Sequence, residues 1–167
     1  MKTCTYISGS PCAGKSTVTK AIQRSVPGIE HVRGDYYWTI YPDLPFEERV
    51  EKVNQDILAS LRDSGSSDVL CEWVPCRGGF VAQLYDTCVS VDRQFLHIIL
   101  TAPAPVLRKR KQERDGDEDI GSEVATLPDE QKVYICLVFD TEEEETSRVA
   151  GEISRWILSN KELKATR

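Results

Sequence analysis

Hydrophobic residues follow two spacings that alternate along the chain. Five short apolar runs, rich in β-branched and aromatic residues, have the character of buried strands. The segments between them carry hydrophobic residues at helical spacing, most clearly Val50, Val53 and Ile57. We expect strands over residues 2–8, 29–33, 69–71, 95–100 and 133–139. We expect helices over residues 16–24, 46–62, 80–89, 105–114 and 143–158.

This alternation of strands and helices predicts the fold class. Strands separated by helices form βαβ units, which combine into a parallel sheet with helices on both faces. The chain has 167 residues, a length typical of one compact domain, and it contains neither an internal repeat nor a linker. We therefore expect a single α/β domain over residues 1–167.

Composition and charge narrow the classes of partner. The 27 acidic residues outnumber the 21 basic ones, giving a formal net charge of −6. Long nucleic acid normally recruits a basic face, so duplex DNA is a poor fit as the main partner. No apolar run is long enough to span a membrane, and the N-terminus lacks the pattern of a signal peptide. The six cysteines include no C-x-x-C pair, which favours free thiols and a cytoplasmic protein.

A phosphate-binding motif follows the first predicted strand. Residues 9–16 match the P-loop pattern G-x-x-x-x-G-K-S/T, between a strand and a helix. Glycines allow successive N–H groups to face phosphate oxygens, and the helix adds the positive end of its dipole. Lys15 is expected to reach the β- and γ-phosphates and the Ser16 hydroxyl to bind Mg²⁺, so the motif predicts a nucleoside triphosphate with magnesium. The expected nucleotide contacts are Gly9, Ser10, Pro11, Cys12, Ala13, Gly14, Lys15, Ser16 and Thr17.

Two acidic residues end predicted strands. Asp35 comes just after the second strand, at the edge of the sheet where ligands bind. A carboxylate there can accept the proton of an attacking hydroxyl, which makes Asp35 a candidate general base; its other reading is a helix cap or turn residue. Glu72 ends the third strand, where a carboxylate can hold Mg²⁺ through water or contact the substrate. A strand that happens to end in Glu is the alternative.

A basic helix supplies two candidate transition-state residues. Arg110 and Arg114 are four residues apart and share one helix face. Guanidinium groups above a phosphate chain neutralise charge that develops during transfer. A glycine-containing acidic loop follows and could exclude water from the reaction. The alternative is a solvated basic helix.

Taken in order, these motifs resemble the small P-loop kinases of the nucleoside-monophosphate-kinase-like group. The branch is the one with gluconate and shikimate kinases, chloramphenicol phosphotransferase and polynucleotide 5′-hydroxyl kinases. The resemblance covers essentially the whole chain and reaches Asp140 and Thr141 after the last strand. It implies a five-stranded parallel sheet of order 2-3-1-4-5, ATP and Mg²⁺ as cofactors, and Asp35 as general base. It also implies a lid over about residues 108–125 that carries Arg110 and Arg114.

The chain departs from each subfamily of this branch near the acceptor. Shikimate kinases carry a D-x-D pair after the second strand, whereas Tyr36 and Tyr37 follow Asp35 here. Polynucleotide 5′-kinases often carry Arg three residues after the base, where this chain has Trp38. The aromatic residues could stack a base or sugar face, or could be packing. The residues expected to contact the acceptor are Arg33, Asp35, Tyr37, Glu72 and Arg77.

Three functions remain, in order of preference. The first is an ATP-dependent kinase acting on a hydroxyl of a small molecule. The second is a kinase of polynucleotide 5′-hydroxyl ends, nucleosides or nucleotides. The third, of another class, is a GTPase-like switch or a non-catalytic nucleotide-binding protein; the guanine motif N-K-x-D has only a near miss at Asn160 and Lys161. The sequence leaves the acceptor and the oligomeric state open.

Overall fold

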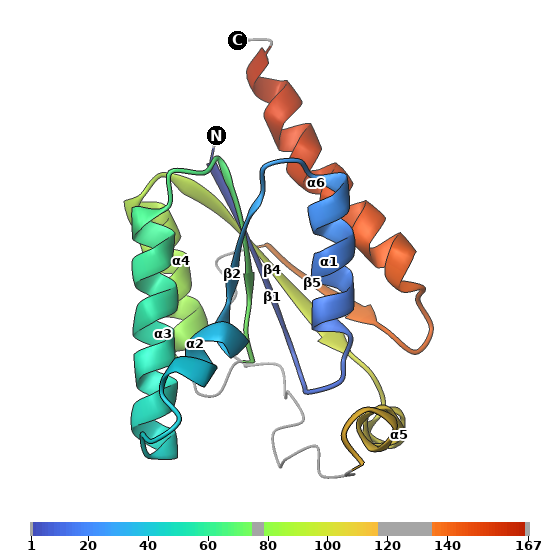
Figure 1. Cartoon of the computed structure of the whole chain (residues 1–167). Helices are drawn as coiled ribbons and strands as arrows, with labels where there is room; N and C mark the ends of the chain where they lie inside the picture. The colour runs from blue at the N-terminus through green and yellow to red at the C-terminus, as the bar shows by residue number, and fades with distance from the viewer. Residues whose placement is uncertain (1, 75–78, 117–134, 166–167) are drawn as a thin grey trace.

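The computed structural model describes residues 2–74, 79–116 and 135–165, and in these ranges the chain forms one α/β sheet structure (Figure 1). No helix in the described ranges is long and apolar enough to cross a membrane. The elements in chain order are β1 (Lys2–Gly9), α1 (Lys15–Ser25), β2 (Glu30–Arg33), α2 (Gly34–Ile40), α3 (Phe46–Asp63), β3 (Asp68–Glu72), α4 (Phe80–Ser90), β4 (Arg93–Thr101), α5 (Ala104–Asp115), β5 (Ile135–Asp140) and α6 (Thr146–Ala165).

The five strands form one parallel sheet in the order β2-β3-β1-β4-β5, as the resemblance implied. Helices α1 and α6 cover one face, and α3 and α4 cover the other (Figure 1). Because both faces are covered, β1 is buried from its second residue, Thr3, onward. The expected fold class is confirmed.

Side chains alternate between two cores along each central strand. Ile7 and Leu70 belong to the core beneath α1 and α6, with Val18 and Ile153 from those helices. Tyr6 belongs to the other core, beneath α3 and α4. The parallel register brings the carboxyl ends of the strands to one edge, so Gly9, Arg33, Glu72, Thr101 and Asp140 end strands on the same side.

The structure adds one helix to those expected. Helix α2 has seven residues, too few for a hydrophobic period to emerge, and it starts directly after β2. Gly34 permits this tight junction, because a Cβ there would lie 2.1 Å from Cε3 of the buried Trp73. Asp35 therefore stands in the first turn of α2. The last strand is described from Ile135, so the expected residues 133–134 lie outside the described ranges.

The cysteines that the structure describes are all free thiols. Three of them, Cys4, Cys71 and Cys88, are buried in the core between the sheet and α3 and α4. Burial raises the pKa of Cys71 far above its usual value. Cys12 and Cys136 are half-buried. The expectation of free thiols is confirmed for these five residues.

Candidate active site

The P-loop takes the backbone path that its glycines allow. Gly9 ends β1 at φ 148° and packs so tightly that a Cβ would lie 2.3 Å from the Leu100 carbonyl oxygen. Gly14 caps α1 in the left-handed region at φ 91°, and Cys12 also has a positive φ, 65°. The loop thus wraps back on itself, and the N-terminus of α1 opens toward the carboxyl edge of the sheet.

Lys15 is buried inside the loop. Its Nζ donates hydrogen bonds to the carbonyls of Gly9 (2.9 Å) and Ser10 (3.0 Å). Burial lowers the pKa of Lys15, and the negative charges of Asp35 and Glu72 oppose that shift. The ammonium group is therefore held among the loop carbonyls, within the field of both candidate carboxylates.

A cavity of about 400 Å³ opens at the P-loop and gathers most of the predicted site. Residues from four separate parts of the chain meet there. The lining consists of Pro11, Cys12, Gly14, Lys15, Ser16, Thr17, Asp35, Val74, Arg110 and Arg114. The four residues expected to be catalytic, Lys15, Asp35, Arg110 and Arg114, thus share one cavity.

Glu72 and Ser16 meet beside this cavity. The Ser16 hydroxyl donates to Oε1 of Glu72 at 2.5 Å, although 56 residues separate the two in sequence. Oε2 of Glu72 accepts from the Thr19 hydroxyl at 2.7 Å and lies 3.2 Å from Nε2 of His31. Burial by itself would raise the pKa of Glu72, but the hydrogen bonds from His31, Ser16 and Thr19 outweigh it and lower the pKa to about 2. Glu72 is an ionised carboxylate at neutral pH.

Thr19 and His31 are the two residues of this network that sequence reasoning missed. Thr19 follows Ser16 by three residues, so helical spacing alone could have placed it on the same face of α1. His31 lies two residues before the end of β2. Its contact with Glu72 depends on the register between β2 and β3, which local sequence does not reveal.

The two arginines of α5 have different surroundings. Arg110 donates to the Thr141 hydroxyl at 2.9 Å, to the Thr141 carbonyl at 2.7 Å and to the Cys12 carbonyl at 3.5 Å. It ties the P-loop to the segment after β5. Arg114 makes a two-pronged pair with Asp115, at 2.7 and 2.6 Å, and 61% of its side chain is exposed. The Asp115 carboxylate raises the pKa of Arg114.

Asp35 also lines the cavity. It is exposed at the start of α2, and its charge acts on both Lys15 and Arg114. A carboxylate in this position is accessible to an acceptor that enters from solvent. This geometry suits a group that receives a proton at the γ-phosphate end of a bound nucleotide.

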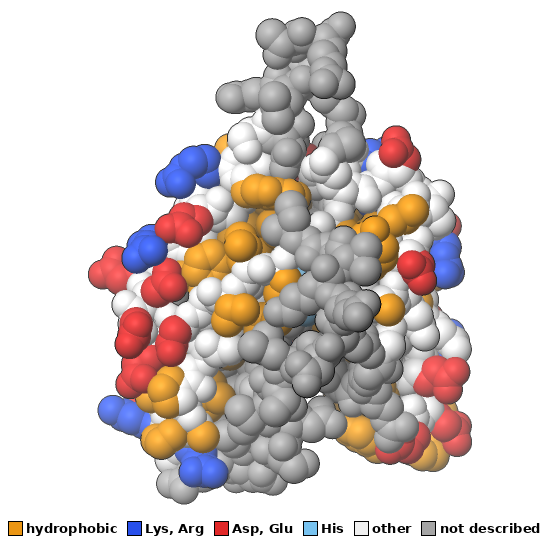
Figure 2. Space-filling model, turned by 180° about the vertical axis from the view of Figure 1, so that it is seen from behind, with side chains coloured by type: hydrophobic (Ala, Val, Ile, Leu, Met, Phe, Trp, Pro, Cys, Tyr) orange, Lys and Arg blue, Asp and Glu red, His pale blue; other side chains and the backbone are white. Residues whose placement is uncertain are grey.

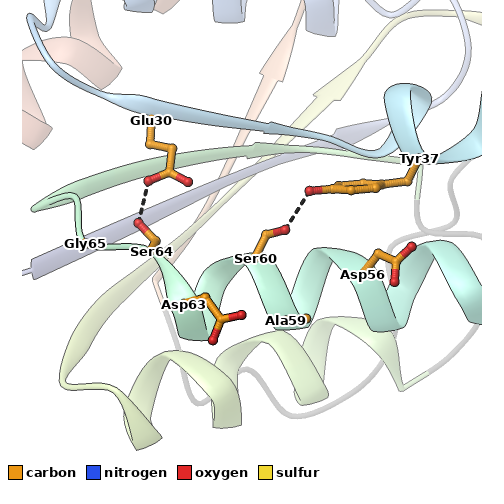
Figure 3. A pocket seen from close by; sticks show the side chains of 8 residues that line it. All are labelled: Glu30, Tyr37, Asp56, Ala59, Ser60, Asp63, Ser64 and Gly65. Atoms are coloured by element: carbon orange, nitrogen blue, oxygen red, sulfur yellow. Dashed lines mark hydrogen bonds between the residues drawn. The ribbon is translucent and has the colours of Figure 1, made fainter.

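The other residues expected at the acceptor lie elsewhere or outside the described ranges. The Tyr37 hydroxyl shares a 2.6 Å hydrogen bond with Ser60, and both line a separate cavity between β2 and α3 (Figure 3). Arg33 is exposed at the end of β2. Arg77 lies outside the described residues. Neither Tyr37 nor Arg33 is among the described residues of the P-loop cavity.

The aromatic cluster after Asp35 is mostly packing. Trp38 contacts Trp73 at 6.0 Å between ring centroids, and the Trp73 indole donates to Asn54 at 3.0 Å. The Tyr41 hydroxyl donates to Asp56 at 2.5 Å. Tyr36 is different, because 60% of it is exposed. Only the ring of Tyr36, among the aromatic side chains described between residues 36 and 41, is exposed to this extent.

The surface has mixed charge. On the face seen from behind in Figure 2, lysine and arginine side chains are interspersed with acidic ones along both flanks. Hydrophobic side chains are exposed between these flanks. This distribution agrees with the formal net charge of −6.

The fold is shared with solved structures of small kinases. An APS kinase from Mycobacterium tuberculosis, solved with AMPPNP and APS, matches with a TM-score of 0.67 and 15% identity, over 91% of this chain and 95% of that chain. A shikimate kinase from Acinetobacter baumannii, solved with shikimate, matches with a TM-score of 0.66 and 17% identity, over 96% of both chains.

A gluconokinase from Sinorhizobium meliloti 1021 matches over 98% of this chain and 97% of that chain, with a TM-score of 0.63 and 17% identity. No family model and no curated protein matches the sequence. At such low identity these likenesses concern the fold. They confirm the fold that the resemblance implied, and the matched proteins are themselves kinases of different small molecules.

Proposed function

We propose that this protein is an ATP-dependent kinase that transfers the γ-phosphoryl group to a hydroxyl of a small molecule. The observation that carries the proposal is the shared cavity, where Asp35 faces the P-loop and the α5 arginines. A carboxylate that lines the same cavity as the P-loop can take the proton of an acceptor hydroxyl, which is what a transferase requires. Kinase neighbours named for acceptors as different as shikimate and gluconate support the reaction class.

The residues that would hold Mg²⁺ fit that ion. The Ser16 hydroxyl and the ionised Glu72 carboxylate are hard oxygen donors beside the P-loop. Magnesium is commonly held by one or two protein oxygens together with waters and phosphates. Ser16 would bind the ion directly and Glu72 through water. When bound, the ion neutralises charge on the β- and γ-phosphates.

The reaction follows from the remaining residues. P-loop N–H groups and Lys15 hold the phosphates, and Asp35 orients the acceptor hydroxyl and takes its proton. The acceptor oxygen bonds to the γ-phosphorus as the bond to the β-phosphate oxygen breaks, which leaves ADP. Arg114 is exposed at the cavity and would stabilise the transferring group, whereas Arg110 holds the P-loop and Thr141 in place. No covalent enzyme intermediate is required.

The first test is ADP release from Mg-ATP against pooled acceptors. The pools are sugars and sugar acids, aminocyclitols and other antibiotics, nucleosides and nucleotides, and 5′-hydroxyl oligonucleotides. We expect acceptor-dependent turnover that Lys15→Ala and Asp35→Asn each reduce by at least 10²-fold, in line with the usual contribution of a positioned base. Asp86→Asn on α4 removes an exposed carboxylate remote from the cavity and serves as the matched control.

Two results contradict the proposal. Nucleotide binding with no turnover in any pool favours the switch or binding-protein class. Turnover that survives Asp35→Asn unchanged supports a kinase but removes Asp35 from the role of base.

A second candidate is a kinase of nucleosides or of 5′-hydroxyl nucleic-acid ends. The exposed ring of Tyr36, next to Asp35, favours it, because aromatic faces stack on bases. Turnover confined to the nucleoside or oligonucleotide pools selects this candidate over the first.

A further inference from the structure

The buried Glu72 carboxylate has three hydrogen-bond partners for its two oxygens. One partner would be enough to avoid an unpaired buried charge. Oε1 is occupied by the Ser16 hydroxyl, and Oε2 by both the Thr19 hydroxyl and the His31 imidazole. These donors come from α1, which covers one face of the sheet, and from β2, which pairs with β3. The carboxylate is thus fixed in orientation as well as paired.

Thr19 and His31 are built into the core, not onto the surface. Thr19 is fully buried on the same face of α1 as Ser16, one helical turn away. The His31 side chain is 10% exposed, and the parallel register sets it opposite Leu70, two residues before Glu72 on the same face of β3. Neither side chain lines the P-loop cavity among the described residues. They reach the site only through Glu72.

The three donors differ in what they must do during binding. The Ser16 hydroxyl would be the P-loop ligand of Mg²⁺, so its bond to Glu72 would be the one released when the ion binds. Thr19 and His31 have no such second task. Their bonds to Oε2 would hold the carboxylate in place after the bond from Ser16 to Oε1 is released.

We propose that Thr19 and His31 are positioning residues of the Mg²⁺ site, which hold Glu72 in the orientation that a metal-bound water requires. The proposal rests on the function proposed above and assigns a role to two residues that no P-loop motif includes. Partners that orient a metal-binding group typically contribute 10- to 100-fold to metal affinity.

The test measures binding of a non-hydrolysable ATP analogue while Mg²⁺ is titrated, so it does not depend on the acceptor. We expect Thr19→Val and His31→Leu each to raise the Mg²⁺ concentration for half-maximal binding about 10-fold. Thr19→Ser and His31→Gln keep a donor and should restore most of the affinity. Binding in EDTA should change by less than twofold in all four variants.

Thr3→Val is a matched control for stability. The Thr3 hydroxyl donates to the Asp68 carboxylate at 2.7 Å, the same length as the Thr19 bond to Glu72, and it is also buried, at the opposite end of β3. Thr3→Val should lower the melting temperature by about as much as Thr19→Val does. It should leave the Mg²⁺ dependence of nucleotide binding unchanged.

The outcomes separate the two proposals. Wild-type binding that does not depend on Mg²⁺ overturns the assigned Mg²⁺ site and this inference with it, whereas the proposed kinase function is decided by the ADP-release test. Mg²⁺-dependent wild-type binding that Thr19→Val and His31→Leu leave unchanged overturns only the inference. If Thr19→Val is too unstable to assay, the comparison of His31→Leu with His31→Gln decides, because equal Mg²⁺ dependence in those two contradicts a positioning role.

Discussion

At the scale of single residues, Glu72 combines burial with ionisation. A carboxylate that is only 3% exposed stays charged because Ser16, Thr19 and His31 compensate for lost hydration. The same arrangement links the site to the stability of the fold. Glu72 has a folded-state pKa of about 2, below the value of 4.5 expected when the chain unfolds. The ionised form therefore stabilises the folded state.

This shift gives a prediction with a definite sign. The stabilisation is complete above about pH 5 and is lost as the pH falls through the folded-state pKa, near 2. At one pKa unit per 1.36 kcal/mol the shift is on the order of 3 kcal/mol. Glu72→Gln should therefore be less stable than wild type at pH 7, and the gap should narrow as the pH falls from about 5 towards 2.

Denaturant unfolding of both proteins at pH 7, 5, 4 and 3 measures this gap. Glu30→Gln is the control, since Glu30 accepts a hydrogen bond from Ser64 in the other cavity, away from the P-loop (Figure 3). The difference in unfolding free energy between Glu30→Gln and wild type should be smaller than that of Glu72→Gln at pH 7. A Glu72→Gln difference that is the same at every pH contradicts the account of the ionised, hydrogen-bonded carboxylate.

At the scale of elements, the junction between β2 and α2 sets the position of the candidate base. Helix α2 can start directly after the strand only because Gly34 has no side chain where the Trp73 ring lies. Trp73 in turn follows Glu72 on β3 and is held by Asn54 of α3. The Trp73 ring thus packs between the sheet, α2 and α3, and its position fixes where α2 and Asp35 lie.

Gly34→Ala tests this connection. A methyl group 2.1 Å from a ring carbon must displace either α2 or Trp73, and such overpacking costs about 1–3 kcal/mol. We expect lower stability together with a fall in kcat of at least 10-fold and little change in the KM for ATP, because the P-loop is untouched.

Gly65→Ala is the matched control, since a Cβ at Gly65 meets nothing within 4 Å. It should leave both kcat and stability near wild type. Wild-type kcat in Gly34→Ala would show that the position of Asp35 does not depend on this junction.

At the scale of the whole molecule, the sequence predicted those features of the fold and the site that depend on a local or continuous pattern. The strand periods and the P-loop spacing predicted the α/β sheet and the positions of Lys15 and Ser16. The spacing of Arg110 and Arg114 predicted one shared helix face, and both residues line the P-loop cavity. What it could not predict depends on contacts across the sheet. His31 reaches Glu72 because of the register between β2 and β3, which the expected strand order does not specify. Tyr37 turns toward Ser60 because α2 lies over α3.

The central claim is that the P-loop cavity transfers a phosphoryl group to an acceptor and not to water. The most direct measurement is ³¹P NMR of Mg-ATP incubated with the active pool and wild-type protein. We predict a new phosphate-ester resonance that grows in step with ADP and is absent with Asp35→Asn, which should still bind ATP. ADP accompanied only by inorganic phosphate, with or without acceptor, would contradict the account.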